Sequence, residues 1–513
     1  MSIITIETYS DFPPPFTFDG WQGIAYGLRA WTTFFLPRAA GTLETQPTTL
    51  GSPLLRCVDR HLDRPDMNPA EAQRSTPTAA EHARFIRDQL PKSGLFADMD
   101  WRISPAPFAL GADLAMELET LGRVLLQFNR AVNLLYRQSV AGKQPPWVSA
   151  WLDCGKPDKL IELQRAAPFK NELPRVIRPD LLVTDHGLAL TELDSVPGGI
   201  GLTAWLNQTY TQIGAGVLGG PDGMLRGFVG IFGDAPAVHV VVSDEAATYR
   251  PEMDWLCHQL NSRGHRFLLR DQKAFAFAEG EAVYRFFELF DLANVPAADA
   301  LFEAAVNKRI RLTPPPKPIF EEKMLFALLW NRNLREFWRR ELGEGFLNRL
   351  LKLVPYTWVV DPTPLPPQAV IPELNLTDWQ QLKTLSQKER ELIVKASGFS
   401  ERAWGARSVY LGSDLSHADW SAAVDAALAG FDHTPCVLQR YHKPRVVESS
   451  YYDFASEQLV PMPGRVRLCP YYFVVGEGDG ARAQLGGALA TICPADKKII
   501  HGMRDAILAP CST

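Results

Sequence analysis

Hydrophobic side chains recur every three or four residues between Leu110 and Val140. This spacing matches one face of an α-helix, so the segment predicts a long amphipathic helix whose apolar stripe belongs to the core. A shorter helical pattern runs from Thr78 to Gln89, and a pair of helices rich in Leu, Trp and Arg is expected between Phe320 and Leu353. Two further helices are expected, an amphipathic one after residue 368 and one near Trp420 to Ala429.

Short β-branched and aromatic runs predict strands between and after these helices. The run that begins at Ala237, the helical pattern Pro251 to Arg263 and the strand after Gly264 together predict a β-α-β unit. Further strands are expected at Leu392 to Lys395, Cys436 to Tyr441 and Arg465 to Val475. Because strands and helices are mixed without strict alternation, the predicted class is α+β, with lobes around more than one sheet.

Two strand-like runs flank Asp185-His186-Gly187, and this segment predicts a β-hairpin with a three-residue turn. Side chains alternate between the faces of a strand, so this register puts four charged residues on one face. The expected cross-strand pairs are Thr184–Leu188, Leu182–Leu190, Asp180–Glu192 and Arg178–Asp194. A two-residue turn would instead divide the carboxylates between the two faces.

Asp180 opposite Glu192 is a like-charge pair that weakens a sheet unless a cation lies between the two side chains. A hard divalent cation such as Mg²⁺, held by carboxylates and completed by phosphate oxygens and water, fits this position. The alternative is an ordinary solvated hairpin face. The glycine-rich segment 196–201 follows directly, and it allows a close backbone approach to a ligand and leads into a helix N-terminus that favours anions.

A second candidate element is the strand that ends in Lys395, followed by a loop that contains Gly398 and Ser400. A lysine neutralises phosphate oxygens, and a glycine-containing loop can close over them. A strand-end lysine that reaches into solvent is the alternative.

These motifs resemble the ATP-grasp superfamily, specifically the circularly permuted branch that includes glutathionylspermidine synthetase and is related to eukaryotic glutathione synthetase. The metal motif of that branch, Arg-x-Asp followed by Glu-x-Asn, is matched by Arg178, Asp180 and Glu192, while Asp194 stands in the place of Asn. The hairpin also precedes the lysine loop, as the permuted order requires. The resemblance implies that Asp180, Glu192 and Asp194 bind Mg²⁺.

The resemblance further implies an ATP site. Lys395, Gly398 and Ser400 would belong to the phosphate loop, which matches the family pattern only loosely. A second phosphate-binding lysine would be Lys323, with Lys352 as the rival. The family's hinge strand, which offers backbone groups to adenine, corresponds to Gln439, Arg440 and Tyr441. Arg467, with Arg465 as the alternative, would join Arg178 in orienting an acyl phosphate.

The predicted architecture is therefore a circularly permuted ATP-grasp fold with a flanking α/β subdomain, of the pre-ATP-grasp kind, and an irregular N-terminal cap. Four segments are expected. Residues 1–105 form the cap, 106–235 the first part of the core with the metal hairpin, 236–312 the α/β subdomain on the substrate side, and 313–513 a helical connector with the nucleotide-binding lobes.

Composition excludes several other classes. The formal charge of −5 from 53 basic and 58 acidic residues gives no general attraction to nucleic acid, and no run approaches the ~20 apolar residues of a membrane helix. The N-terminus lacks a secretory signal pattern, and the seven cysteines show no zinc or disulfide spacing, so a cytoplasmic protein with reduced thiols is expected. The sequence leaves self-association into a homo-oligomer open.

The function implied by the resemblance is an ATP-dependent carboxylate–amine ligase that forms an amide through an acyl phosphate and releases ADP. Its cofactors would be ATP and Mg²⁺, and its substrates a small-molecule or peptide carboxylate and an amine acceptor. Two alternatives stay open at this stage. One is an ATP-dependent phosphotransferase. The other is a degenerate, non-catalytic ATP-binding scaffold, which would explain why Asp194 and the lysine loop depart from the family pattern.

Overall fold

A seven-stranded sheet forms the centre of the computed structural model, which describes residues 78–91, 101–403, 407–500 and 505–513. The strand order is β1-β17-β16-β15-β2-β3, and β12 pairs with β15. The strands are β1 (Phe108–Ala109), β2 (Val176–Thr184), β3 (Gly187–Asp194), β12 (Val446–Val447), β15 (Gly464–Val475), β16 (Arg482–Pro494) and β17 (Ile507–Ser512). The long antiparallel pair β15 and β16 forms the middle of this sheet.

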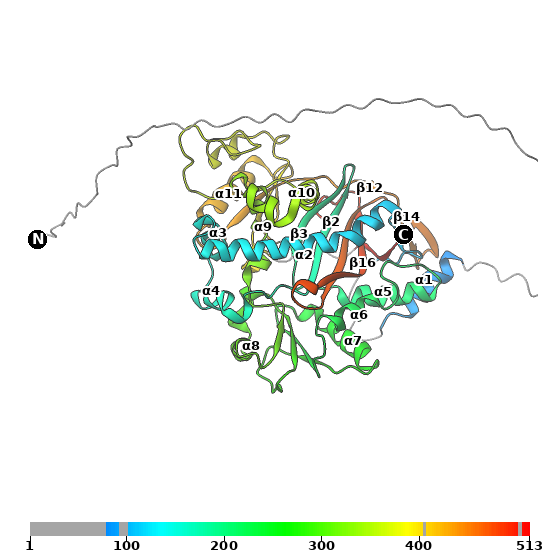
Figure 1. The fold of residues 1–513 in the computed structure, drawn as a ribbon. Helices are drawn as coiled ribbons and strands as arrows, with labels where there is room; N and C mark the ends of the chain where they lie inside the picture. The colour runs from blue at the N-terminus through cyan, green and yellow to red at the C-terminus, as the bar shows by residue number, and fades with distance from the viewer. Residues whose placement is uncertain (1–77, 92–100, 404–406, 501–504) are drawn as a thin grey trace, which may run out of the picture. The chain divides into compact units, whose positions relative to one another are not determined.

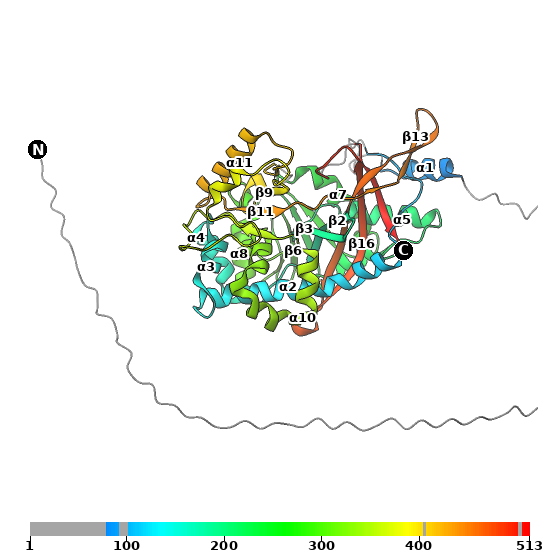
Figure 2. The same cartoon turned by 90° about the horizontal axis from the view of Figure 1, so that it is seen from above.

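The two faces of the sheet pack against different helices because side chains alternate along β15. On one face the Tyr472 hydroxyl donates a hydrogen bond of 2.5 Å to the Leu118 carbonyl of α2 (Ala112–Val140), the long helix predicted from the sequence. On the other face Phe473 packs so closely on Gly227 of α6 (Gly223–Gly230) that a Cβ there would lie 2.1 Å from the ring. Figure 2 shows β2 and β16 between α2 and α7.

The predicted β-α-β unit is part of a parallel four-stranded sheet with the order β5-β4-β6-β7. Its strands are β4 (Val238–Val242), β5 (Phe267–Arg270), β6 (Ala282–Phe286) and β7 (Arg311–Thr313), and its helices are α7 (Arg250–Asn261) and α8 (Ala298–Val306). The chain passes from β4 to β5 on one side, then crosses back to β6 on the other side of β4. The loops that leave β4 and β6 therefore diverge, which opens a crevice at their carboxyl ends.

A small antiparallel sheet with the order β10-β9-β11-β8 forms the third unit, and α11 packs on it. Its elements are β8 (Thr357–Val359), β9 (Leu392–Ala396), β10 (Tyr410–Leu411), β11 (Cys436–Arg440) and α11 (His417–Ala429). The predicted amphipathic helix after residue 368 is wrong, since the structure has only a 3-10 helix at Trp379–Thr384. The buried residues Trp379 and Leu382 are three positions apart, a spacing that also suits 3-10 geometry.

The other helices surround these sheets (Figure 1). They are α1 (Ala79–Asp88), α3 (Pro146–Asp153), α4 (Asp158–Arg165), α5 (Ile200–Gln212), α9 (Met324–Trp330) and α10 (Arg335–Leu353), and β13 (Ser450–Asp453) pairs with β14 (Gln458–Pro461). The predicted helices at 78–89 and in the 320–353 region are confirmed as α1, α9 and α10. A capping box between Thr78 and Glu81 explains where α1 begins.

Most of the predicted N-terminal cap, including Cys57, lies outside the described residues. The six cysteines in the described part form no disulfide. None of the helices in that part is long and apolar enough to cross a membrane.

We predict that Leu121→Ala in α2 lowers the free energy of unfolding by about 2–5 kcal/mol, because this fully buried side chain packs in the main core. Glu119→Ala on the exposed side of the same helix is the matched control and should change it by less than about 0.5 kcal/mol. Urea denaturation followed by tryptophan fluorescence measures both. Equal effects of the two substitutions would contradict this packing.

Candidate active site

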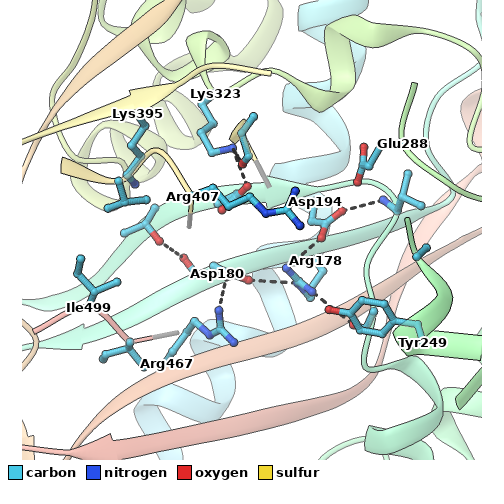
Figure 3. A pocket seen from close by; sticks show the side chains of 18 of the residues that line it. Arg178, Asp180, Asp194, Tyr249, Glu288, Lys323, Lys395, Arg407, Arg467 and Ile499 are labelled. Carbon is cyan, nitrogen blue, oxygen red and sulfur yellow. Dashed lines mark hydrogen bonds and ion pairs between the residues drawn. The ribbon is translucent and has the colours of Figure 1, made fainter. Parts of the chain in front are cut away.

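A cavity of about 460 Å³ is lined by residues from all three larger sheets. The main sheet contributes charged side chains from β2, β3 and β15, the small antiparallel sheet contributes the end of β9 and Tyr441, and the parallel sheet contributes the loops after β4 and β6. The charged residues that line it are Arg178, Asp180, Glu192, Asp194, Glu245, Glu288, Lys323, Lys395, Arg407, Arg467 and Lys498. Figure 3 shows that many of these side chains point toward one another.

The hairpin β2–β3 forms the predicted charged pairs, but its turn and its register near the turn differ from the prediction. The turn has two residues, Asp185 and His186, so Thr184 pairs with Gly187 and Leu182 with Ala189. The predicted pairs Thr184–Leu188 and Leu182–Leu190 are therefore wrong. A register shift at Thr191 then adds one residue on β3 and restores the pairs Asp180–Glu192 and Arg178–Asp194.

Arginines neutralise Asp180 and Asp194. The Arg178 guanidinium lies 3.1 Å from Asp180 and 3.0 Å from Asp194, and Arg467 Nη1 donates to Asp180 Oδ2 at 3.1 Å. Burial is the largest single effect and lowers the pKa of both arginines, but Asp180 and the other acidic groups nearby together outweigh it, so both pKa values are raised. Burial raises the pKa of Asp194, against the lowering effect of Arg178.

Lys323 and Lys395 reach the same cavity from separate elements. Lys323 precedes α9, and its Nζ lies 2.9 Å from Glu192 Oε1 and donates to the Ala403 carbonyl at 3.0 Å. Burial is the largest single effect and lowers the pKa of Lys323, but Glu192, Glu322 and Glu288 together outweigh it, so the pKa is raised. The rival Lys352 lies on α10 and lines a different cavity, beside the tip of the hairpin.

Lys395 on β9 is buried, and its Nζ donates to Gln439 Oε1 at 3.0 Å. No carboxylate of a described residue lies within ion-pair distance of this ammonium group. Burial lowers the pKa of Lys395 to about 8. Lys395 is therefore a buried cation that an incoming anion would stabilise.

Gly398 and Ser400 do not line the cavity. A Cβ at Gly398 would lie 2.3 Å from the Glu321 carbonyl, so this glycine allows close backbone packing. The Ser400 hydroxyl accepts a hydrogen bond from the Arg402 amide at 3.2 Å. The same loop reaches the cavity through Ala403 and Arg407 instead.

The strand β11 does not offer its backbone as predicted. It is hydrogen-bonded to β9 on one side and β8 on the other, and the Arg440 and Tyr441 amides donate to the carbonyls of Tyr356 and Glu391. The Gln439 side chain contacts Lys395, the Arg440 side chain is exposed, and Tyr441 lines the cavity. Tyr441 therefore contributes a ring and not a backbone donor.

Arg465 and Arg467 have distinct roles, although both lie on the same face of β15. The Arg465 guanidinium donates to the carbonyls of Ala495 and Pro444 and so ties loops together. Arg467 lines the cavity and contacts Asp180. The geometry therefore favours Arg467 as the arginine that faces a ligand.

The segment 196–201 supplies both the close approach and the helix N-terminus expected from the sequence, but the N-terminus holds the chain's own carboxylate. Gly198 lines the cavity, and α5 begins directly after Gly199. Glu252 of α7 accepts a hydrogen bond of 2.8 Å from the Gly201 amide. Burial raises the pKa of Glu252 to about 7. The hydrogen bonds that its carboxyl group accepts from the Gly201 amide and neighbouring amides act in the opposite direction and lower it.

The two acidic residues directly before Lys323 have side chains that are only 8% and 1% exposed. Glu321 pairs with Arg285 at 2.7 Å, and Glu322 pairs with Lys156 at 2.6 Å. Neither residue was recognised from the sequence, because consecutive charges normally indicate a solvated segment.

The sequence analysis expected the α/β subdomain on the substrate side but named none of its residues. Ser243, Glu245 and Tyr249 follow β4, and Glu288 follows β6, so all four stand at the carboxyl edge of the parallel sheet. The polar residues directly after the apolar run at 237–242 were the available signal.

The donor chemistry of the cavity suits a hard cation, since Asp180 and Glu192 are opposite one another and Mg²⁺ commonly uses one or two protein carboxylates. Within the described ranges, no group of three His, Cys, Asp or Glu side chains is close enough to hold a metal ion by itself. A metal here would therefore depend on ligands from a bound molecule.

Comparisons with known proteins support the fold. No family model matches the chain, and no curated protein matches it either. Among solved structures, a glutathione synthetase like-effector from Globodera pallida, in its apoform, superposes with a TM-score of 0.50 at 12% identity, over 86% of this chain and 98% of that chain. This chain has a glutathione synthetase-like fold. The circular permutation stays a prediction.

A second solved structure, from Methylobacillus flagellatus KT and provisionally named a gamma-glutamylcysteine synthetase, has 13% identity and a TM-score of 0.35. It covers 74% of this chain and 86% of that chain. At this TM-score it adds nothing to the comparison.

We predict that Lys395 titrates at about pH 8, below the ordinary lysine value of 10.5. At a pH between the folded-state pKa of about 8 and the ordinary value of 10.5, Lys395 binds more protons in the unfolded chain than in the folded chain. The residue therefore makes the free energy of unfolding rise as the pH rises through that window. NMR of ¹³C-methylated lysines measures the titration, and Lys395→Arg assigns the signal. A midpoint at the ordinary lysine value would contradict the buried position.

Proposed function

We propose that this protein is an ATP-dependent ligase that joins a carboxylate to an amine through an acyl phosphate. The observation that carries the proposal is the convergence of Lys323, Lys395, Arg178 and Arg467 on one cavity beside Asp180 and Glu192. Cations that converge from separate lobes suit a polyphosphate, and paired carboxylates suit its metal ion. The glutathione synthetase-like fold supports the same class of reaction.

The nucleotide would lie along the small antiparallel sheet. The cavity lining includes Ile393, Val409, Ile499 and Ile500, and the Tyr441 hydroxyl donates to the Lys498 carbonyl at 3.4 Å, next to Ile499. Such a surface suits a purine, which would stack and pack there. Lys395 lies on the same strand as Ile393, two residues further along, so its ammonium group would meet the phosphates.

Asp180 and Glu192 would hold Mg²⁺, which would supply positive charge to the phosphate oxygens when bound. Both carboxylates are held in place by cations, Asp180 by Arg178 and Arg467, and Glu192 by Lys323. Asp194 is engaged by Arg178 and by the Val196 amide at 2.8 Å. Asp194 would therefore act mainly by positioning Arg178.

The chain's own residues would contribute by fixing charge in the cavity before the substrates bind. Lys323 and Lys395 would neutralise the transferred phosphoryl group, and Arg178 and Arg467 would orient the acyl phosphate. All four side chains line the cavity and are largely shielded from solvent, which strengthens such contacts. No side-chain nucleophile is needed. The acid is a small molecule or a peptide with a free carboxylate, and the acceptor is an amine.

We predict that Glu192→Gln lowers the rate of ATP turnover at least about 100-fold, because it removes charge at nearly constant volume from the site that would hold Mg²⁺. Glu119→Gln on the exposed face of α2 is the control and should keep full activity. ADP release is measured with a panel of acids and amines, and the melting temperature checks folding. Normal turnover in Glu192→Gln would contradict the metal assignment.

We predict that one ATP is converted to ADP and phosphate for each amide formed. With an acid labelled in its carboxylate with ¹⁸O, mass spectrometry should find one labelled oxygen in inorganic phosphate. Label in AMP would overturn the acyl-phosphate step. A phosphorylated product formed without an amine would indicate a phosphotransferase, and tight ATP binding without turnover across the panel would indicate a scaffold.

A further inference from the structure

The carboxyl edge of the parallel sheet contributes a part of the cavity lining that is separate from the proposed nucleotide site along the small antiparallel sheet. Strands β4 and β6 are neighbours, and the loops after them diverge toward β5 and β7. Residues in those loops line the cavity, namely Ser243, Glu245, Ala246, Tyr249, Phe287 and Glu288. In open parallel sheets, a crevice of this kind is where ligands bind.

Glu288 differs from the other acidic residues in this crevice. The carboxylates of Asp180, Glu192, Asp194 and Glu245 each form an ion pair with a lysine or arginine. Among the lining residues that the structure describes, Glu288 is the one acidic side chain without such a pair. In Figure 3 it lies at the opposite side of the view from Lys395, with Arg178 and Asp180 lower in the view.

The neighbours of Glu288 are fixed, so they cannot rearrange to neutralise it. Its carboxyl group, when protonated, donates a hydrogen bond to Glu321. Glu321 is itself held by Arg285 at 2.7 Å and by the Leu289 amide at 3.0 Å. The Arg285 side chain is 1% exposed and is already engaged with backbone carbonyls of the segment 314–315.

We infer that Glu288 binds the ammonium group of the acceptor amine at the crevice between β4 and β6 and takes one of its protons. This inference rests on the proposed ligase function. The ammonium ion supplies the opposite charge that this carboxyl group lacks in the protein alone. The acceptor nitrogen would then face the acyl phosphate held by Arg178 and Arg467.

The charged groups around Glu288 agree with this role. Burial and then Glu321 and Asp194 raise the pKa of Glu288, and Arg285 lowers it. Lys323 is also within electrostatic range, and Glu288 raises its pKa. A cation bound at Glu288 would favour the ionised carboxylate, and a carboxylate with a raised pKa is a stronger base for an ammonium proton.

In the reaction, the ammonium ion gives one proton to the Glu288 carboxylate, and the neutral nitrogen forms a C–N bond at the carbonyl carbon of the acyl phosphate. The C–O bond to phosphorus-bound oxygen then breaks, and a second proton from nitrogen leaves with the phosphate as HPO₄²⁻. Glu288 afterwards releases its proton to water.

We predict that Glu288→Gln binds n-butylamine at least about tenfold more weakly than the unmodified protein, because a charged hydrogen bond is lost. Isothermal titration calorimetry measures this in protein saturated with Mg²⁺ and a non-hydrolysable ATP analogue, and n-butanol is the uncharged ligand control. The amide of Gln can still donate to Glu321, so the fold should be kept. Glu303→Gln on the exposed side of α8 is the matched control and should bind as the unmodified protein does.

Acid-dependent turnover separates this inference from the proposed function. Hydroxylamine is uncharged at neutral pH, so Glu288→Gln should form hydroxamate at a rate within about threefold of the unmodified protein but lose at least about 100-fold in kcat/KM for n-butylamine. Equal use or equal binding of n-butylamine by the two proteins, or no binding of it by either, would overturn the role of Glu288. Absence of hydroxamate and of acid-dependent ADP release in the unmodified protein would instead count against the ligase.

Discussion

The ion pairs among Arg178, Asp180 and Arg467 are the interaction on which the cavity depends. The central sheet is apolar on the side of α2, but on the other side β2 and β15 carry charges away from bulk water. Isolated buried charges are costly, whereas a chain of opposite charges with good hydrogen bonds is tolerated. Asp180 stands between two arginines at 3.1 Å each, so the removal of that carboxylate would leave two guanidinium groups facing each other.

Three consecutive residues join this charged face to the surrounding units. Glu321 binds Arg285 of the parallel sheet, Glu322 binds Lys156 and the Ser397 hydroxyl after β9, and Lys323 binds Glu192 of the hairpin. Glu321 ends the short 3-10 helix Pro318–Glu321, Glu322 is extended, and Lys323 precedes α9, so the three side chains leave a segment of changing backbone conformation. One short segment therefore joins the cavity walls, because its charges pair with residues of the parallel sheet, of the segment between α3 and α4, and of the hairpin.

The sequence predicts the elements and much of the cavity, because helix periodicity, strand alternation and the carboxylate pattern are local signals. It finds Lys323, Lys395 and Arg467. Only the fold, however, favours Lys323 over Lys352 and Arg467 over Arg465. The sequence analysis missed both the two-residue turn of the hairpin and the register shift at Thr191. These two errors cancel, so the predicted pair Asp180–Glu192 is still correct. The β11 backbone and Glu288 depend on which strands are neighbours, and single-sequence patterns do not carry that information.

Glu252 has a consequence for selectivity. Helix N-termini attract anions, and α5 begins beside the cavity, so the fold contains two places that would compete for the same phosphate group. The Glu252 carboxylate already accepts the Gly201 amide and occupies one of them. An external anion would have to displace a buried, covalently tethered rival to bind there. Glu252 therefore competes with any external anion at the N-terminus of α5, and under the proposed function this would favour the lysines as the phosphate site.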